Sequence, residues 1–554
     1  MAFTPSKMRH MPTKPSPQFR LSPAGHKSPT RNSRDDQTLS LKQIIGITTT
    51  SSNGFDSLEA ARCFAYVAGA AAVLSTLDEK GLPVCQRYFR ARPSAEPLNL
   101  QAPLYDPPTP LGPKPRAAAG PRDSYAGSAL FGSPGYDSGL DSPSNKTTSM
   151  RERTKAATCV SLSPDGKLLA VGEVYRSIRF SYILANRNWK TGHKPRVLIF
   201  STAKDVPTDV PLTILSDHTF GVRCVAFSAD SQYLASLGDI NDGFLYIWAI
   251  DHRTGSATLH ASNKCTSQIR QIAWLGSNLV TVGTRHVKIW RIEDGTQSPS
   301  PSKRFNEANY LNPSTRALFG RNCLLGPLLD QTFSAVTPIM SNKAIVTSDQ
   351  GDICLLDDGD ISPRFFKVAD AGFSINTAIL SLTKFVIVGG HNGQMKCFEV
   401  EDLSTCIPSL ERAMCDGKLM ASGHEQKHII AMAPLNDQLV TLDSKCTIGI
   451  LSLGHNFGGT RTCSLAHQFP AHAAAVLGVQ SFSLPNDLDV AFVTWCADGL
   501  VLLWNSAGIC AKAVNVQLDQ LNCGEEGLMN ELRVIQVLES SECLVSGDRF
   551  GIIR

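Results

Sequence analysis

The sequence has no hydrophobic run long enough to cross a membrane and no signal-peptide pattern at its start. Its longest apolar run, Phe64 to Leu74, has eleven residues, whereas a transmembrane helix needs about twenty. The first forty residues are basic and Ser-rich, as in a transit peptide, but they contain six prolines and no amphipathic helix pattern. We therefore predict no membrane partner.

Cysteine pairing motifs are also absent. The chain has 16 cysteines among 554 residues, too few for a disulfide scaffold at this length, and none form a C-x-x-C pair. Several of them stand among β-branched and apolar residues, namely Cys159, Cys224, Cys354 and Cys397. We expect buried, reduced thiols, which are typical of cytoplasmic or nuclear proteins.

Charge of neither sign dominates, since 53 Lys and Arg against 49 Asp and Glu give a net charge of +4. Residues 1–40 alone carry +5, so the rest of the chain sums to −1. A nearly neutral body has no strong attraction to the phosphates of nucleic acids or lipids. Nucleic acid is not favoured as a partner, although an RNA-processing or chromatin-associated protein that uses its basic tail stays as the alternative.

Motifs for nucleotide binding and for hydrolysis are missing as well. The sequence has no phosphate-binding P-loop, no dinucleotide fingerprint and no nucleophile elbow. One literal match to a zinc-protease motif is His424-Glu425-Gln426-Lys427-His428. Gly423 before it and Pro434 after it indicate a loop entering a strand, whereas zinc chemistry needs both histidines on one helix. We predict no catalytic residue, no metal site and no cofactor.

Proline, serine and glycine are concentrated in segments that we expect to be disordered. Residues 1–40 form a basic tail, and residues 91–150 hold 11 Pro, 6 Gly and 8 Ser. Such segments cannot bury enough apolar area to offset the entropy lost on ordering. Ser-Pro pairs recur there and at 298–304, and a base follows Ser28 and Ser300 three residues later. These two serines are candidate phosphosites, where a phosphate adds about −1.5 to −2 charge.

Outside these segments, short apolar strands recur between Gly and Asp turns. The strands that end at Trp248 and Trp290 are 42 residues apart, as are those that end at Leu356 and Phe398. Asp-Gly and Asn-Gly turns favour hairpins because such turns require positive φ. A period of about 40–45 residues with four strands per unit is typical of a β-propeller. We expect nine units, of which the last is unfinished at Arg554.

Two units carry, in order, a His, a Ser or Thr, a turn Asp and a Trp: His218, Ser236, Asp242 and Trp248 in one, and His472, Thr494, Asp498 and Trp504 in the other. In this they resemble WD40 repeats. The resemblance implies a hydrogen-bonded set inside each blade, because a buried imidazole and a buried indole N–H need partners. We interpret both sets as structural rather than as a catalytic triad.

Further stretches follow one another in a distinctive order: 41–48, 162–173, 218–228, 261–264 with 282–290, 318–326 and 546–551. Together they resemble a WD40 subfamily, that of mitogen-activated protein kinase binding protein 1 and its microcephaly-linked paralogue. The resemblance implies two tandem propellers, scaffolding of c-Jun N-terminal kinase modules and, for the paralogue, work at spindle poles. The chain lacks the C-terminal region that resembles the kinase-docking part, so we regard it as a divergent and truncated relative.

We therefore predict an all-β protein of tandem WD40 β-propellers, the second incomplete. The expected parts are a disordered basic tail, a first blade, a disordered insertion, the remainder of the first propeller and the start of a truncated second one, at 1–40, 41–90, 91–150, 151–455 and 456–554. The predicted function is a non-catalytic scaffold for protein partners in MAP kinase signalling or spindle-pole organisation. The expected location is the cytoplasm, with the spindle pole, the cytoskeleton or the nucleus as alternatives. Candidate contact positions are the turn residues Asp239, Arg285, His391 and Arg549.

Overall fold

The computed structural model describes most of the chain outside its N-terminal tail and its long insertions. The described residues are 41–91, 156–174, 195–240, 242–292, 316–359, 362–406, 415–421, 427–455, 461–482, 489–518, 530–538 and 543–554. The tail 1–40, the insertion apart from Ala91, and the candidate phosphosites Ser28 and Ser300 lie outside these residues.

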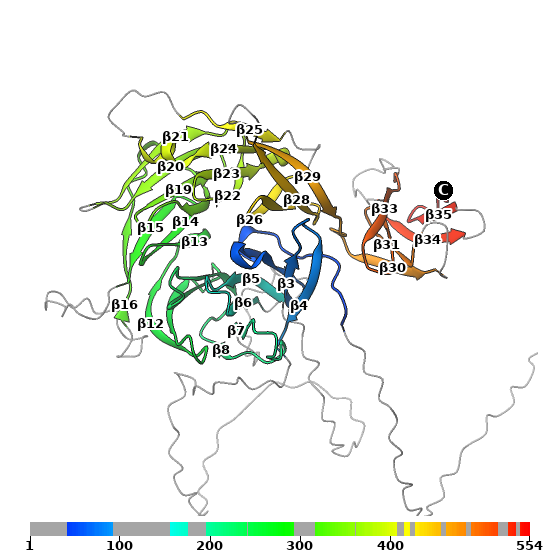
Figure 1. Ribbon diagram of the computed structural model, residues 1–554, viewed down its shortest axis with the longest axis horizontal. Helices are drawn as coiled ribbons and strands as arrows, with labels where there is room; N and C mark the ends of the chain where they lie inside the picture. The colour runs from blue at the N-terminus through cyan, green and yellow to red at the C-terminus, as the bar shows by residue number, and fades with distance from the viewer. Residues whose placement is uncertain are drawn as a thin grey trace, which may run out of the picture. The chain divides into compact units, whose positions relative to one another are not determined.

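The described structure is nearly all β-sheet, and the all-β prediction is confirmed (Figure 1). Successive four-stranded antiparallel sheets, here called blades, each use one stretch of chain. Blade 1 has β1 (Phe55–Leu58), β2 (Cys63–Ala68), β3 (Ala71–Leu77) and β4 (Pro83–Phe89); blade 2 has β5 (Ala156–Leu162), β6 (Leu168–Val174), β7 (Val197–Ser201) and β8 (Thr213–Leu215); blade 3 has β9 (Val222–Phe227), β10 (Tyr233–Gly238), β11 (Phe244–Ile250) and β12 (Ala257–Lys264).

Blades 4 to 7 repeat this pattern. Blade 4 has β13 (Ile269–Leu275), β14 (Asn278–Gly283), β15 (His286–Arg291) and β17 (Phe319–Asn322); blade 5 has β18 (Phe333–Pro338), β19 (Lys343–Ser348), β20 (Asp352–Asp357) and β21 (Arg364–Asp370); blade 6 has β22 (Ile375–Ser381), β23 (Phe385–Gly390), β24 (Met395–Glu399) and β25 (Lys418–Ala421); blade 7 has β26 (Ile429–Leu435), β27 (Gln438–Asp443), β28 (Ile448–His455) and β29 (Arg461–Phe469). One extra strand, β16 (Arg316–Ala317), pairs in parallel with β12.

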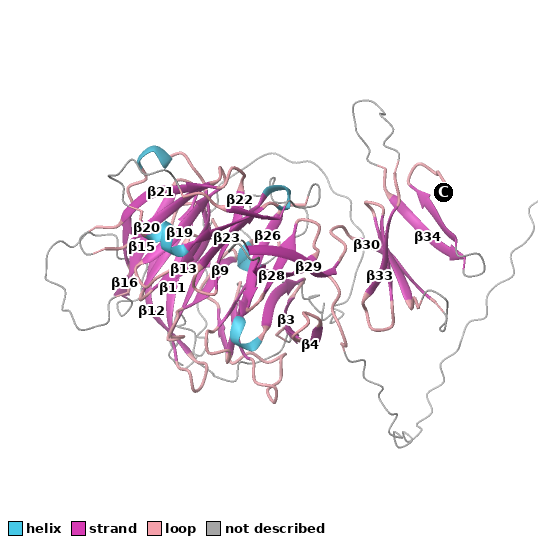
Figure 2. Cartoon of the chain, turned by 45° about the horizontal axis from the view of Figure 1, so that its top comes forward, coloured by secondary structure: helices cyan, strands magenta, loops and turns pink. Residues whose placement is uncertain are grey.

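Helical segments are short and lie before the first strand or between strands (Figure 2). They are η1 (Ser52–Gly54), η2 (Glu59–Ala61), η3 (Gly326–Leu328), η4 (His391–Gly393) and α1 (Val400–Ser404). None of the helices among the described residues is long and apolar enough to cross a membrane.

The first strands of the seven blades form a closed ring. Each contacts the first strand of the next blade, and β1 contacts β26. Seven hydrophobic cores lie between the blades, each shared by two neighbours. The closed ring is therefore a seven-bladed β-propeller, and its free energy of folding comes mainly from the faces between blades.

This arrangement explains the continuous apolar runs in the sequence. In β2, Cys63, Ala65 and Val67 face the core shared with blade 2, whereas Phe64 and Tyr66 face the core shared with blade 7. Because side chains alternate along a strand, a strand covered on both faces needs apolar residues at every position.

The tryptophans that mark the repeat in the sequence stand on the third strand of a blade and not on its fourth and last strand. Trp248 lies on β11 and Trp290 on β15, and a fourth strand follows each of them. At the end of the ring, β29 pairs with β28, so blade 7 continues to Phe469. The boundary predicted between 455 and 456 falls inside this sheet and has to be moved to the end of β29. The sequence did not show this because the outermost strand is more polar than the others and its apolar pattern is weaker.

Two more sheets follow the ring. Blade 8 has β30 (Val476–Ser481), β31 (Phe492–Cys496), β32 (Leu500–Trp504) and β33 (Cys510–Asn515), and a two-stranded sheet has β34 (Leu532–Leu538) and β35 (Cys543–Asp548). They share a core in which Trp495 and Leu532 are buried. The contact between β30 and β34 repeats the contact between successive blades of the ring.

Blade 1 is joined to blade 2 by a partly buried carboxylate. Asp56 on β1 accepts a hydrogen bond from the backbone N–H of Leu162 on β5, at 2.7 Å. It also accepts one from the N–H of Ser57, at 2.8 Å. Burial of the carboxyl raises its pKa to about 6, and these hydrogen bonds oppose the rise only in part.

The first prediction concerns this carboxylate. The folded pKa of Asp56 exceeds the unfolded value, so the folded protein holds the proton more tightly between about pH 4 and pH 6. The free energy of unfolding must fall as the pH rises through that window, by at most about 3 kcal/mol. Asp56→Asn keeps an acceptor for Leu162 and removes this loss. Urea unfolding at pH 4.5 and pH 7 measures it; an unchanged difference between the two pH values in the variant would contradict the prediction.

Candidate functional site

The first strand of every blade begins on the same face of the ring, here called the entry face. The turns between second and third strands also lie on this face, because each strand of a blade runs antiparallel to the one before it. Asp239, Arg285 and His391, expected as contact positions, all stand in such turns or at their edges. Arg549 follows β35 and therefore lies outside the ring.

A β-bulge recurs near the start of the first strands, at the second residue in five blades and at the third in blade 2. Each bulge leaves one residue without a partner on the second strand, at Thr158, Arg223, Arg270, Ser334, Asn376 and Ile430 of the ring. A bulge turns its side chain away from the regular pleat. Six of the seven blades thus present one side chain at the mouth of the central channel.

Two of these bulge residues also hold neighbouring blades together. The Thr158 hydroxyl donates to the Val222 carbonyl of blade 3, at 2.5 Å. The Asn376 amide donates to the Ile429 carbonyl of blade 7, at 2.9 Å. These bonds fix the positions of the first strands, so the mouth of the channel is a rigid rim.

Blades 3 and 4 place two arginines at equivalent positions of this rim. Arg223 is partly buried and lies 3.5 Å from the Asp239 carboxylate. Arg270 is exposed. Its backbone carbonyl accepts a hydrogen bond from the Asn53 amide at 2.8 Å, and its guanidinium has no partner among the described residues. In the next turn, Arg285 is exposed and pairs loosely with an exposed aspartate.

Two apolar side chains stand beside these arginines. Phe220 is 53% exposed and Ile240 is 50% exposed. The N–H of Asp239 donates to the carbonyl of Gly221, which brings the chain neighbours of the two apolar residues together. We call Phe220, Ile240, Arg223, Arg270 and Arg285 the basic–apolar sector. Apolar residues beside exposed or weakly paired arginines are typical of surfaces that bind proteins.

The first predicted set of structural residues is brought together in blade 3. The His218 ring is hydrogen-bonded through Nδ1 to the Asp242 carboxylate and through Nε2 to the Ser236 hydroxyl, each at 2.9 Å. The Trp248 indole N–H donates to the same hydroxyl, also at 2.9 Å. All four side chains are buried, so no substrate can reach the hydroxyl. The set ties the entry-face connection before β9 to the middle of its blade.

The second set is brought together only in part. His472 and the Trp504 indole both contact the Thr494 hydroxyl at 2.7 Å. The other ring nitrogen of His472 contacts the Cys496 thiol at 3.0 Å, and that thiol contacts the Asp498 carboxylate. Asp498 therefore does not reach the imidazole as predicted, because Cys496 lies between them.

Blade 4 holds a third set that the sequence analysis missed. The Thr281 hydroxyl lies 2.8 Å from the His286 ring and accepts the Trp290 indole N–H at 3.0 Å. The histidine is the first residue of β15 and does not come from the connection before the blade. A Thr nine residues before a Trp was the available signal, since Ser236 and Thr494 precede their tryptophans at similar spacing.

The zinc-protease match contributes no metal site among the described residues. His424 and Glu425 lie outside them, and Lys427 and His428 lead directly into β26. His428 stacks on His391 with ring centroids 4.2 Å apart, and one of its nitrogens accepts the N–H of Asn392. No group of three or more described His, Cys, Asp or Glu residues is arranged to hold a metal ion.

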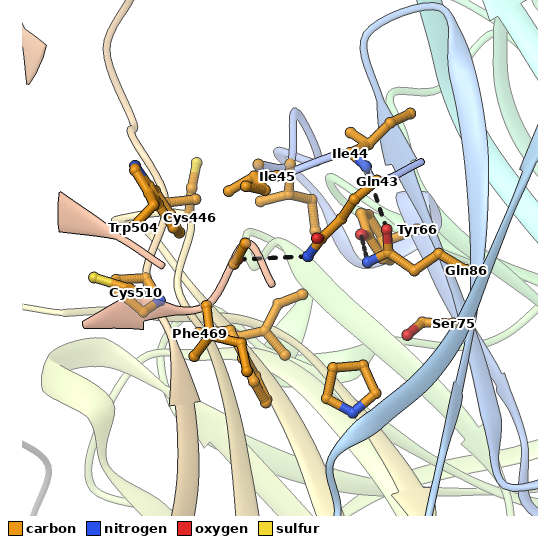
Figure 3. Close-up of a pocket in the computed structure, with 18 of the residues that line it drawn as sticks. Gln43, Ile44, Ile45, Tyr66, Ser75, Gln86, Cys446, Phe469, Trp504 and Cys510 are labelled. Atoms are coloured by element: carbon orange, nitrogen blue, oxygen red, sulfur yellow. Dashed lines mark hydrogen bonds between the residues drawn. The ribbon is translucent and has the colours of Figure 1, made fainter. Parts of the chain in front are cut away.

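A pocket lies beside the junction of blades 1 and 7 (Figure 3). Gln43 donates to the Gly508 carbonyl, and Gln86 joins the N–H of Ile44 to the Tyr66 hydroxyl. Apolar and aromatic residues make up most of the wall, and none of the lining residues is charged or a histidine. The contacts that the pocket offers are therefore mainly apolar.

Comparison with known proteins finds one family model that matches a single repeat, and several distant relatives. A family model described as WD domain, G-beta repeat matches residues 209–249, which contain the whole His218 set. Mitogen-activated protein kinase-binding protein 1 of Mus musculus is 27% identical over 455 residues, covering 72% of this chain and 27% of the relative. Cilia- and flagella-associated protein 52 of Chlamydomonas reinhardtii is 18% identical over 383 residues, covering 66% and 50%.

Among solved structures, Chaetomium thermophilum Sqt1 bound to the N-terminus of ribosomal protein L10 is similar to this chain. The TM-score is 0.38 at 14% identity, and the match covers 70% of this chain and 93% of Sqt1. The chain spans half or less of the length of the two curated relatives.

The second prediction tests the buried set of blade 3. His218→Ala leaves the carboxylate of Asp242 and the hydroxyl of Ser236 buried without their partner. We expect a loss of about 2–4 kcal/mol in the free energy of unfolding. His252→Ala, at an exposed position of the same blade, is the matched control and should change stability by less than about 0.5 kcal/mol. Equal losses in the two variants, measured by urea unfolding, would refute the prediction.

The third prediction concerns His286. Burial lowers the pKa of this imidazole to about 4, with a smaller effect from Lys288. The unfolded chain then binds the proton more tightly between about pH 4 and pH 6.5. Stability must rise with pH through that window, by at most about 3 kcal/mol, which is the opposite slope to that of Asp56. His286→Gln keeps a donor for Thr281 and should remove the rise; a variant that keeps the wild-type pH profile of unfolding would count against it.

Proposed function

We propose that this WD40-repeat propeller is a non-catalytic scaffold that holds protein partners on its entry face. The observation that carries the proposal is the basic–apolar sector on a rim fixed by bonds between blades. A partner that docks there meets preformed side chains, so little entropy is lost on binding.

The buried state of the His–Ser–Asp–Trp set supports the non-catalytic part of the proposal. Ser236 has no exposed surface, and its hydroxyl is already engaged by His218 and Trp248. A nucleophile has to reach the substrate, and this hydroxyl cannot. The role of the set is to stabilise blade 3, which carries part of the sector.

The chemistry of the sector favours a partner segment that combines acidic and apolar residues. Arg270 has an exposed guanidinium, and Arg223 and Arg285 each have a single aspartate at 3.4–3.5 Å. Arginine binds carboxylates and phosphates through two parallel hydrogen bonds. Phe220 and Ile240 supply the apolar contact that such a segment needs for affinity.

MAP kinase signalling or spindle-pole organisation is the finer proposal for the biological setting, with the cytoplasm, the spindle pole or the nucleus as the location. It rests on similarity to mitogen-activated protein kinase-binding protein 1. The cilia- and flagella-associated relative is compatible with a cytoskeletal partner. Proximity labelling of the full-length protein in dividing cells tests the setting: kinase-module or spindle-pole neighbours support it, and a neighbourhood of ribosome-assembly factors would overturn it.

The fourth prediction tests the surface. In a selection of displayed peptides on the purified protein, we expect enrichment of segments that alternate acidic and apolar residues. Arg223→Glu combined with Arg270→Glu should weaken binding of a selected peptide at least about tenfold, since each charge-assisted contact contributes about 1.5–3 kcal/mol.

The matched control is Arg253→Glu, which reverses an exposed charge of blade 3 in the turn between its third and fourth strands. That turn lies on the face opposite the entry face. The control should leave the dissociation constant unchanged. If the control weakens binding as much as the double variant, or if selected peptides carry no acidic residues, the sector is not the docking surface.

A further inference from the structure

The connection between β24 and β25 of blade 6 brings two thiols into contact. Cys406 follows α1, and Cys415 stands shortly before β25. Their sulfur atoms are 3.3 Å apart. Both thiols also lie near the carbonyl of Asp402, at 3.2 and 3.5 Å. Both residues are partly exposed, so a small reagent can reach them.

Both thiols rest on the joint between blades 5 and 6. Upstream of Cys406, Leu403 of α1 is fully buried in the core that the two blades share. The Lys343 ammonium of blade 5 donates to the Ser404 carbonyl at 2.9 Å. On the other side, the N–H of Cys415 donates to the Val368 carbonyl of β21 at 3.1 Å. The two ends of the connection are thus held by blade 5 independently.

We propose that Cys406 and Cys415 are an oxidative modification site, at which a hydroperoxide converts the two thiols into a reversible disulfide that locks the joint between blades 5 and 6. A disulfide needs a sulfur–sulfur distance of about 2.0 Å, so the sulfurs have to approach by about 1.3 Å. Rotation of the side chains supplies this distance without moving either anchor on blade 5.

The chemistry takes two steps. The thiolate of one cysteine attacks a peroxide oxygen, the O–O bond breaks, and a sulfenic acid and water form. The thiolate of the second cysteine attacks that sulfur, the S–O bond breaks, and the hydroxyl leaves as a second water. Two thiols and one hydrogen peroxide give one disulfide and two waters, and the sulfurs supply both electrons.

The surroundings of the two thiols make disulfide formation slow and make its rate depend on pH. Burial and the adjacent thiol of Cys406 raise the pKa of Cys415 to about 11, so its reactive thiolate is scarce at neutral pH. The rate of disulfide formation should therefore increase between pH 7 and pH 9. Such a pair responds to sustained oxidation rather than to a brief pulse.

The sequence allows a direct readout by mass spectrometry. Trypsin cleaves after Arg412, between the two cysteines, and so separates peptide 397–412 from peptide 413–418. After treatment of the native protein with hydrogen peroxide, alkylation and digestion, we expect these peptides to be joined by a disulfide and to separate on reduction. Cys406→Ser and Cys415→Ser should each abolish the joined peptide.

Three controls make the outcome decisive. Cys397 shares the first peptide, so retention of the joined product in Cys406→Ser would assign the bond to Cys397 and overturn the proposal. Cys85→Ser removes an exposed thiol of blade 1 and should leave the yield unchanged. If peroxide oxidises Cys85 while peptides 397–412 and 413–418 stay separate, the pair is not a disulfide site.

The structural effect of the bond is measured on the wild-type protein. The oxidised form should unfold a few degrees higher than the reduced form, because the closed loop restricts the unfolded chain. The difference should disappear in Cys406→Ser. A disulfide that forms without any shift in the melting temperature would refute the locking of the joint.

Discussion

The ring depends on the packing of blade 1 against blade 7. Every other junction joins blades that are adjacent in the sequence, whereas this one joins residues nearly 400 positions apart. Among the residues that the structure describes, no strand is exchanged across it, since each blade is built from one stretch of chain. Closing a loop of this length costs about 5 kcal/mol in chain entropy. The core shared by the two blades buries residues such as Phe55, Phe64 and Leu435, and each such side chain contributes about 1.5–3 kcal/mol, which outweighs that cost.

Polar contacts then fix the register of this junction. Gln438 of blade 7 accepts from the Arg62 guanidinium and donates to the Glu79 carbonyl, both at 3.3 Å. The N–H of Asn436 donates to the Glu59 carboxylate at 2.9 Å. These bonds contribute less free energy than the core, but they are directional. Apolar packing closes the ring, and the polar contacts decide how the two blades face each other.

Groups with distinctive chemistry gather where blades meet. Asp56 joins blades 1 and 2, the bulge residues line the rim between first strands, and the thiol pair lies against the joint of blades 5 and 6. The hydrophobic cores also lie between neighbouring blades, whereas the histidine sets join residues of a single blade. Because close-packed side chains fill the joints, a partner or an oxidant that acts on a joint acts on the contacts that hold the ring together.

The sequence alone was sufficient for the fold class and for the set in blade 3. Alternating cores on both faces of a strand produce apolar runs at a period of 42 residues, and that pattern is local. From the sequence we also interpreted the histidine, serine and aspartate of that set as structural rather than as a catalytic triad. The sequence predicted four strands per unit but did not show where each fourth strand lies, because an outermost strand is covered on fewer sides and need not be apolar. This misplaced the boundary at 455.

Other features were decided only by the tertiary structure. Cys496 separates His472 from Asp498, although the spacing of the residues follows the pattern of blade 3. The arginines at 223 and 270 become neighbours on the rim because bulges on adjacent strands turn them to the same mouth. Cys406 and Cys415 are nine residues apart in sequence, and only their separate anchors on blade 5 bring the two sulfurs into contact. A residue pattern predicts which side chains of one strand are buried. Contacts between strands and between blades depend on how the blades pack when the ring closes.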